Sequence, residues 1–204
     1  MRLLNLRTAL VITVLVGTAA YCQEKGWIKL SGKGGTFTTM APEGWVVSDP
    51  KDPTFTSSVE KFKESNPKIA EQMSEKADDD SILMAFDTTS ITKEGMIDVL
   101  YVLKDAKSQL TPEMYPDVVE ELAKGEQIKG KLESKILDFP VGKTLTYWYT
   151  MTVKVEGKGD TEMDQYGLMF VHDGDLYVAS FVGQAGSLAK KKPVWEKIAK
   201  SFKF

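Results

Sequence analysis

Few residues of this 204-residue chain have the types needed for acid–base or metal chemistry, and their spacing does not favour it. His172 is the single histidine and begins the stretch His-Asp-Gly-Asp at 172–175. Asp-Gly between alternating apolar residues is the strongest short signal for a two-residue hairpin loop. We therefore expect His172 at an exposed hairpin tip, paired with Asp175 across a loop that contains Gly174. We interpret His172 as part of this turn, since no nucleophile motif brings a serine to it.

The carboxylates offer more combinations, because the chain has 29 acidic residues. Asp87, at the end of an apolar strand over 82–87, is the best candidate for a carboxylate with a shifted pKa. The alternative, which we favour, is that Asp87 caps the turn at 88–90. The three aspartates at 78–80 lack the ligand spacing of a calcium loop, and one histidine excludes a multi-histidine metal site. The sequence therefore predicts no catalytic, cofactor-binding or metal-binding residue.

The first 22 residues have the pattern of a secretory signal peptide. Arg2 and Arg7 precede an apolar run at 9–16 that is too short to span a membrane, and small residues follow it. Cys22 stands where a bacterial lipoprotein carries its lipid, but the bulky Tyr21 before it argues against lipidation. We expect an extracytoplasmic protein, periplasmic or secreted. It is lipid-anchored only if Cys22 is acylated, and it has no transmembrane anchor after cleavage.

The composition is that of a globular protein, with 42% hydrophobic and 27% charged residues. Lys and Arg number 26 against 29 acidic residues, and removing Arg2 and Arg7 leaves 24 against 29, a net charge of −5. An acidic chain of this kind argues against nucleic acid as a partner. We interpret the basic cluster Lys190–Lys192 as the solvated approach to the last helix, in preference to a membrane-binding site.

The main elements that position these residues begin after a polar, flexible lead-in at 23–35, in which 27–30 is a candidate short edge strand. The glycine-rich end of the lead-in lacks the spacing of a phosphate-binding loop. A strand at 36–40 runs into a corner made by Pro42 and Gly44, and Trp45 resumes the strand. A tryptophan at such a corner is most simply a large apolar residue that closes one end of a core. We therefore expect Gly44 and Trp45 to have structural roles.

The rest of the chain alternates strands and helices. Trp148 falls on the opposite face of its strand from Tyr147, and Trp195 points from the last helix toward the core. Residues 82–86 are apolar on both faces, so both faces of the sheet should be covered. This predicts an α+β fold, an antiparallel sheet with helices on both faces. The expected elements are a two-part helix at 56–77 interrupted at Pro67, strands at 82–87 and 97–103, a helix at 111–125, strands at 132–137 and 144–153, a hairpin of 165–171 with 175–182, and a helix from Pro193.

Three stretches together resemble the PsbP-like α/β/α sandwich family: APEGW at 41–45, YGLMFVHDGDLYVASF at 166–181 and PVWEKIAKSFKF at 193–204. The family includes PsbP, a eukaryotic Ran-binding import factor and envelope proteins such as DcrB and LpqN, and the chain is most similar to uncharacterised exported bacterial members. The resemblance covers 36–204, which we take as one domain, and its motifs mark the fold and no catalytic site. It implies a non-catalytic envelope module that binds another envelope or extracellular protein. A carrier of a small apolar ligand and an unrecognised hydrolase are the alternatives.

Overall fold

The computed structural model of the chain describes residues 25–75, 81–92, 96–155 and 159–204. The predicted signal peptide, Cys22 and the aspartates at 78–80 lie outside these residues. Over the described ranges, no helix is both long enough and apolar enough to cross a membrane.

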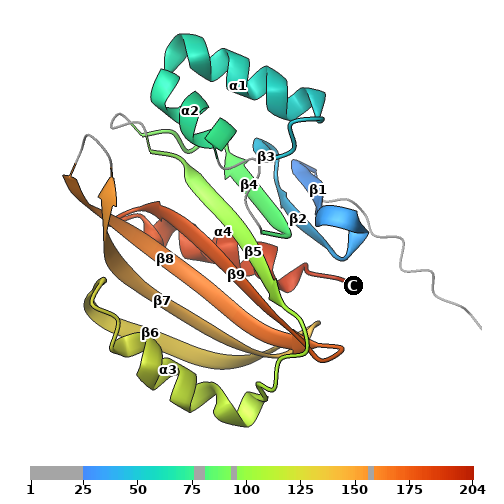
Figure 1. Cartoon of the computed structure of the whole chain (residues 1–204), viewed down its shortest axis with the longest axis vertical. Helices are drawn as coiled ribbons and strands as arrows, with labels where there is room; N and C mark the ends of the chain where they lie inside the picture. Colours follow the sequence, from blue (N-terminus) through green and yellow to red (C-terminus); the bar gives the residue numbers. More distant parts are fainter. Residues whose placement is uncertain (1–24, 76–80, 93–95, 156–158) are drawn as a thin grey trace, which may run out of the picture.

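The core of the fold is a seven-stranded antiparallel sheet in the order β3-β4-β5-β9-β8-β7-β6 (Figure 1). A separate two-stranded sheet pairs β1 (Trp27–Ser31) with β2 (Thr38–Pro42). The strands of the large sheet are β3 (Trp45–Val47), β4 (Leu83–Asp87), β5 (Asp98–Asp105), β6 (Ile128–Phe139), β7 (Gly142–Val155), β8 (Gly159–His172) and β9 (Asp175–Gln184).

The helices start and stop at residues with clear local causes. The Asp52 side chain accepts a hydrogen bond from the Thr54 backbone N–H at 2.7 Å and so caps the first helix. Asn66 ends that helix, and Pro67 opens the next one, as the two-part pattern predicts. The helices are α1 (Pro53–Ser65), α2 (Pro67–Glu75), α3 (Tyr115–Ala123) and α4 (Leu188–Lys200), with short 3-10 turns η1 (Lys33–Gly35) and η3 (Pro112–Met114).

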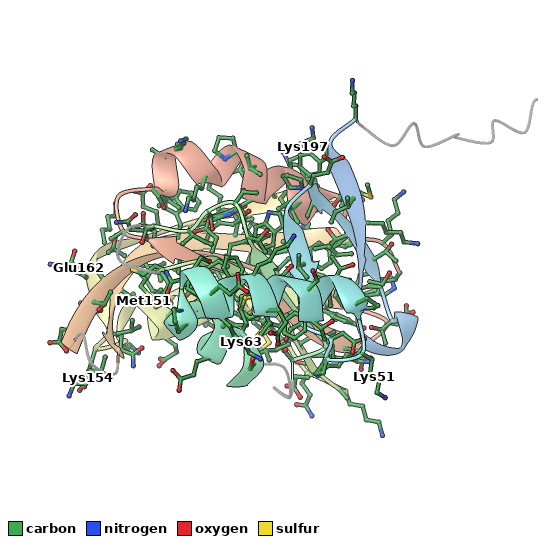
Figure 2. The ribbon with its side chains drawn as sticks, turned by 90° about the horizontal axis from the view of Figure 1, so that it is seen from above. Lys51, Lys63, Met151, Lys154, Glu162 and Lys197 are labelled. Carbon is green, nitrogen blue, oxygen red and sulfur yellow. The ribbon has the colours of Figure 1, made fainter. Side chains whose placement is uncertain are left out.

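The large sheet is covered on both faces, which confirms the predicted α+β sandwich. Helix α4 and the β1–β2 sheet pack on one face, which we call the α4 side. Helices α1 and α2 cover β3, β4 and β5 on the other face, and α3 packs over β7 on that same face, which we call the α3 side. Figure 2 shows α4 and α1 on opposite sides of the sheet. Side chains of β7 alternate between the two sides, with Trp148 on the α4 side and Tyr147 on the α3 side, as predicted.

The hairpin of β8 and β9 has the predicted register. His172 pairs with Asp175, Phe170 with Tyr177, Leu168 with Ala179 and Tyr166 with Phe181. The two loop residues, Asp173 and Gly174, have φ values of 50° and 81°. Positive φ at both central positions is the geometry that matches the twist of a two-residue hairpin.

The last helix begins at Leu188, so the predicted start at Pro193 is wrong. Pro193 lies inside α4, and Lys190–Lys192 belong to the helix instead of preceding it. The helix begins early because the Asp164 carboxylate of β8 accepts a hydrogen bond from the Leu188 backbone N–H at 2.8 Å. An acceptor from another element satisfies one of the free N–H groups of the first turn.

The candidate edge strand at 27–30 is confirmed as β1, which pairs along its whole length with β2. The lead-in at 23–35 is therefore not flexible throughout. Leu30 of β1 is only 2% exposed and belongs to the core under α4. Ordered packing therefore starts at Trp27, nine residues before Thr36, because the alternate residues of β1 close the edge of that core.

Strand β6 forms one edge of the large sheet, and β3 forms the other. The pairing of β6 with β7 shifts register between Lys129 and Glu133, which marks a β-bulge. The exposed residues of β6 include charged side chains on both sides of this shift: Lys129, Lys131, Glu133, Lys135 and Asp138.

Candidate functional site

His172 lies in an aromatic contact at the hairpin tip and has no catalytic geometry. Its ring stacks on that of Phe204 with centroids 4.1 Å apart, and its side chain is 34% exposed, so the tip is less open than predicted. Asp175 instead pairs with Lys104 at 2.6 Å and accepts a hydrogen bond from the Lys107 backbone N–H. The Lys104 hydrogen bond lowers the pKa of Asp175. Asp175 is therefore held by other groups, while His172 Nε2 lies 3.6 Å from the exposed Asp173 carboxylate, beyond hydrogen-bond distance.

Asp87 caps the turn after β4. Its carboxylate accepts hydrogen bonds from the Thr89 backbone N–H at 3.0 Å and from the Thr89 hydroxyl at 2.6 Å.

The carboxylate whose pKa is raised is Asp98, directly opposite Asp87 on β5. Burial raises the pKa of Asp98, and the hydrogen bond with Lys191 of α4, at 2.5 Å, partly opposes this effect. Sequence analysis missed this pair because its two members are 93 positions apart.

The predicted structural residues all lie on the α4 side or in turns. Trp45 is buried and meets Phe181 edge-on at 6.4 Å, and Gly44 before it has φ of 103°. A β-carbon on Gly44 would lie 2.5 Å from the Thr89 side chain, so the corner has no room for one. Trp195 is buried and stacks on Phe181, while Trp148 is buried under Lys192 of α4.

The α3 side has a different composition where three adjacent strands, β5, β9 and β8, cross its centre. Tyr101 of β5 pairs with Ser180 of β9, Ser180 with Gly167 of β8, and Gly167 with Tyr147 of β7. The ring of Tyr147 lies across Gly167 so closely that a β-carbon there would be 2.1 Å from it. Gly167 therefore provides the space that holds Tyr147 flat against the sheet.

A hydrogen-bonded network ties this centre together. The Tyr149 hydroxyl donates to Gln165 Oε1 at 3.1 Å, and Gln165 Nε2 donates to the Ser180 hydroxyl at 3.2 Å. Burial raises the pKa of Tyr147 far above its usual range, although hydrogen bonds with Ser180 and Gln165 oppose that shift. Burial thus strengthens the preference of Tyr147 for its protonated form. The hydrogen bonds of the network fix the orientation of Tyr149, Gln165 and Ser180.

Next to this network, an apolar row is left partly uncovered. Leu103 of β5 is paired with Val178 of β9, and Val178 with Met169 of β8. Leu103 is 42% exposed, and Val178 and Met169 are half-buried. We call these three residues the open row. Met169 packs against the same buried cluster of Tyr115, Leu145 and Tyr147 as the inner residues of α3, so the row extends toward that helix.

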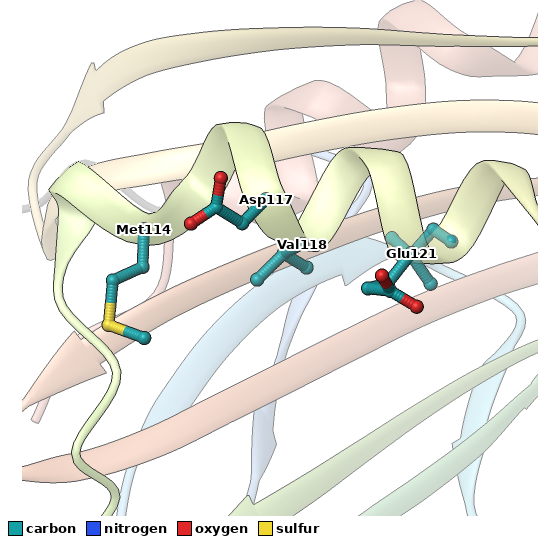
Figure 3. A pocket seen from close by; sticks show the side chains of 5 residues that line it. Met114, Asp117, Val118 and Glu121 are labelled. Carbon is teal, nitrogen blue, oxygen red and sulfur yellow. The ribbon is translucent and has the colours of Figure 1, made fainter.

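A depression of about 390 Å³ runs along one side of α3. Figure 3 shows the side chains of Met114, Asp117, Val118 and Glu121 projecting from the same side of this helix. Val118 and Leu122 give the depression an apolar lining, while Asp117 and Glu121 are exposed at its rim. Apolar contact bordered by negative charge suits a partner that carries both apolar and cationic groups. In the part of the chain that the structure describes, no cluster of His, Cys, Asp and Glu could hold a metal ion.

No family model and no curated protein sequence matches the chain. Among solved structures, the Ran-binding protein Mog1p of Saccharomyces cerevisiae is similar over 87% of this chain and 94% of its own, with 12% identity and a TM-score of 0.50. The chain has a PsbP/Mog1-like fold. The resemblance seen in the sequence is thereby confirmed at the level of fold.

Two further solved structures are similar with lower scores. Cyanobacterial PsbP from Synechocystis sp. PCC 6803 matches 92% of this chain and 98% of its own, with 13% identity and a TM-score of 0.49. LpqN of Mycobacterium tuberculosis, described as involved in cell envelope biogenesis, matches 91% and 95%, with 11% identity and a TM-score of 0.44. At identities this low, a structural match does not identify a site, which must be argued from this chain's own residues.

Proposed function

We propose that this chain is a non-catalytic binding module of the bacterial cell envelope that holds another protein against the α3 side of its sheet. The observation that carries the proposal is the open row, Leu103, Val178 and Met169, beside a depression with an acidic rim. The partner segment that fits this surface has apolar side chains together with lysine or arginine, which would face Asp117 and Glu121.

Exposed apolar groups on a rigid sheet are suited to binding. Leu103 and Val178 belong to β5 and β9, two paired strands in the interior of the large sheet, so their positions are fixed by neighbouring strands. A partner that covers them gains the free energy of removing apolar surface from water without ordering a loop. In the network beside the row, Gln165 and Ser180 are buried, and the half-buried Tyr149 is the member that a partner could reach.

The chemistry of the site supports binding over catalysis. Tyr147 is kept protonated by burial, Asp175 is engaged by Lys104, and Asp98 is engaged by Lys191. None of these groups is placed beside an activated nucleophile in the described parts of the chain. Mog1p, which shares the fold, is itself a Ran-binding protein. That fact concerns Mog1p, and it is consistent with the use of this fold for protein contacts.

The test compares one substitution on each side of the sheet. Leu103→Asp places a charge in the open row, and Val194→Asp places one on α4, where Val194 is 38% exposed against 42% for Leu103. Tagged full-length chain and both variants are used to capture proteins from envelope extracts, with quantification by mass spectrometry. We expect at least one protein to be retained by the native chain and by Val194→Asp, and lost with Leu103→Asp.

Three outcomes would count against this proposal. Equal retention of every captured protein by the two variants would remove the open row from the binding surface. Turnover of a hydrolase substrate that disappears with His172→Ala or Asp98→Asn, in a folded chain, would favour the enzyme alternative. A small apolar compound that co-purifies with the native chain and is lost with Leu103→Asp would favour the carrier.

A further inference from the structure

Helix α4 presents a second charged surface, opposite in sign to that of α3. It carries five lysines and one glutamate within Leu188–Lys200, whereas Tyr115–Ala123 of α3 carries three acidic residues and no basic one. The two helices lie on opposite faces of the same sheet. The helices on the two faces thus differ in charge: α3 is negative and α4 is positive.

The lysines of α4 divide into an inner and an outer set. Lys191 turns inward to Asp98, and Lys192 lies 3.0 Å above the centre of the Trp148 ring with Glu196 at 3.9 Å. Lys190, Lys197 and Lys200 are exposed, and so is Lys203 just after the helix. We call these four residues the lysine face.

Positions 190 and 197 are two helical turns apart and therefore lie on one side of α4, with the exposed Val194 between them. Aromatic rings surround the face, with Lys197 at 4.3 Å from the Trp27 ring centre and Lys200 at 5.7 Å from that of Phe139. Long lysine side chains that rest on apolar rings keep their ammonium groups at the outer surface. The lysine face thus combines positive charge with an exposed apolar residue, Val194.

The path of the chain indicates what this face meets. The Trp27 ring that contacts Lys197 belongs to the start of β1, so the described chain begins beside α4 (Figure 2). Upstream in sequence lie Cys22 and the apolar run at 9–16. Cys22 is five residues before Trp27, a span of at most about 18 Å. Acylation of Cys22, the alternative that the sequence leaves open, would place a lipid within this distance of Trp27 and of the α4 side that it borders.

We infer that the lysine face of α4 binds the anionic headgroups of a membrane surface. Several lysines next to one another bind anionic lipid through their summed charge, with a contribution of about 5-fold in partitioning from each lysine near the surface. This inference is independent of the partner surface on the α3 side. It also replaces the interpretation of Lys190–Lys192 as a solvated approach to the helix, because only Lys190 of the three belongs to the outward face.

The experiment measures sedimentation of the full chain with vesicles of phosphatidylcholine, with and without phosphatidylglycerol. The variant Lys190→Glu/Lys200→Glu replaces two positive charges of the lysine face with two negative ones. The control Lys51→Glu/Lys63→Glu makes the same change in net charge at exposed positions on the α1 side (Figure 2). Thermal unfolding of each variant verifies that it is folded.

We expect phosphatidylglycerol to increase vesicle binding by the native chain and by the control. For Lys190→Glu/Lys200→Glu, this phosphatidylglycerol-dependent increase should be smaller by a factor of at least about 25. Salt should weaken the same component, since exposed charges are screened. Binding through the apolar upstream segment would be equal for both lipids and all variants. The inference fails if the two double variants lose the phosphatidylglycerol-dependent binding equally. It also fails if anionic lipid adds nothing for the native chain.

Discussion

Leu100, Phe181, Tyr166 and Trp148 form one row across the sheet and point to the α4 side, while their neighbours Tyr101, Ser180, Gly167 and Tyr147 point to the α3 side. The first row is entirely buried. The second row contains the two smallest side chains of the centre, and the apolar row beside it is partly exposed. One set of strands thus has a densely packed aromatic face and a shallower face with hydrogen-bonding groups.

This difference separates stability from binding. Large side chains on the α4 side remove apolar area from water and pack against α4, which stabilises the fold. On the α3 side, α1 and α2 cover one end of the sheet and α3 covers the other, so Leu103 remains exposed between them. Substitutions on the two sides should therefore have effects of very different size on the free energy of unfolding.

The largest effect is expected from Trp45→Ala on the α4 side. Trp45 is 3% exposed and in contact with Phe181, so its removal leaves a cavity in the main core. Deletion of a buried large aromatic side chain destabilises a protein by about 3–5 kcal/mol. Urea unfolding followed by fluorescence of the remaining tryptophans measures the change. A stable Trp45→Ala protein that had lost its partner would show that this residue serves recognition instead.

A somewhat smaller loss, about 3 kcal/mol at neutral pH, is expected from Lys191→Met. The substitution leaves the Asp98 carboxylate buried without its cation, and breaking a buried ion pair is costly for that reason. Lowering the pH should recover part of the loss, because the unpaired carboxylate then takes up a proton. Urea unfolding over a pH series measures this, and a loss that did not change with pH would contradict the assignment.

The native chain has its own pH dependence at this site. Burial raises the pKa of Asp98 above its ordinary 3.8, so the folded state binds a proton more tightly than the unfolded state. Stability should therefore fall as the pH rises from about 3.8 through the raised pKa, and Asp98→Asn should remove that component. Identical pH profiles for the native chain and Asp98→Asn would refute it.

Matched glycine substitutions compare the two sides directly, each with an expected loss of about 1–3 kcal/mol from overpacking. A β-carbon on Gly167 would meet the Tyr147 ring, and one on Gly183 would lie 2.5 Å from Asp98 Oδ1. Gly183→Ala should lower the free energy of unfolding by less in a Lys191→Met background than in the native chain, because both changes disturb the same ion pair. The losses caused by Gly167→Ala and Lys191→Met should instead add. The double-variant cycles measure this, and equal coupling for the two glycines would show that the sides are not independent.

The smallest effect on stability is expected from Leu103→Asp, within about 0.5 kcal/mol of the native chain. Leu103 is 42% exposed, so the new carboxylate stays in water. Thermal and urea unfolding test this value. A loss as large as that of Trp45→Ala would mean that the open row contributes to the core, and its use as a binding surface would then lose its basis.

The parts of this fold that could be predicted from sequence depend on local patterns. The Asp173-Gly174 loop fixes the register of its hairpin, and alternation along β7 assigns Tyr147 and Trp148 to opposite sides. Pro67 likewise marks the start of α2. In each case the information lies within a few consecutive residues, where the backbone geometry of a single element is decided.

The features that sequence analysis missed depend on contacts between distant positions. The start of α4 is set by Asp164, which is 24 residues away, and the Asp98–Lys191 pair spans 93. The network of Tyr149, Gln165 and Ser180 arises from the pairing of three strands, so no single segment shows it. For the same reason, a proline does not reliably mark the first turn of a helix. An acceptor elsewhere in the fold can stabilise a helical turn that precedes the proline, as Asp164 does for α4.

The bulged outer strand β6 has a consequence for solubility. An unpaired strand edge offers its N–H and C=O groups to other chains and is a common route to fibrous aggregates. In β6, the register shift after Lys129 interrupts that template, and charged side chains on both sides of it repel a second copy. At the other edge, β3 has only three residues, too few for extended pairing. We therefore expect concentrated solutions of this protein to resist aggregation by strand addition at either edge.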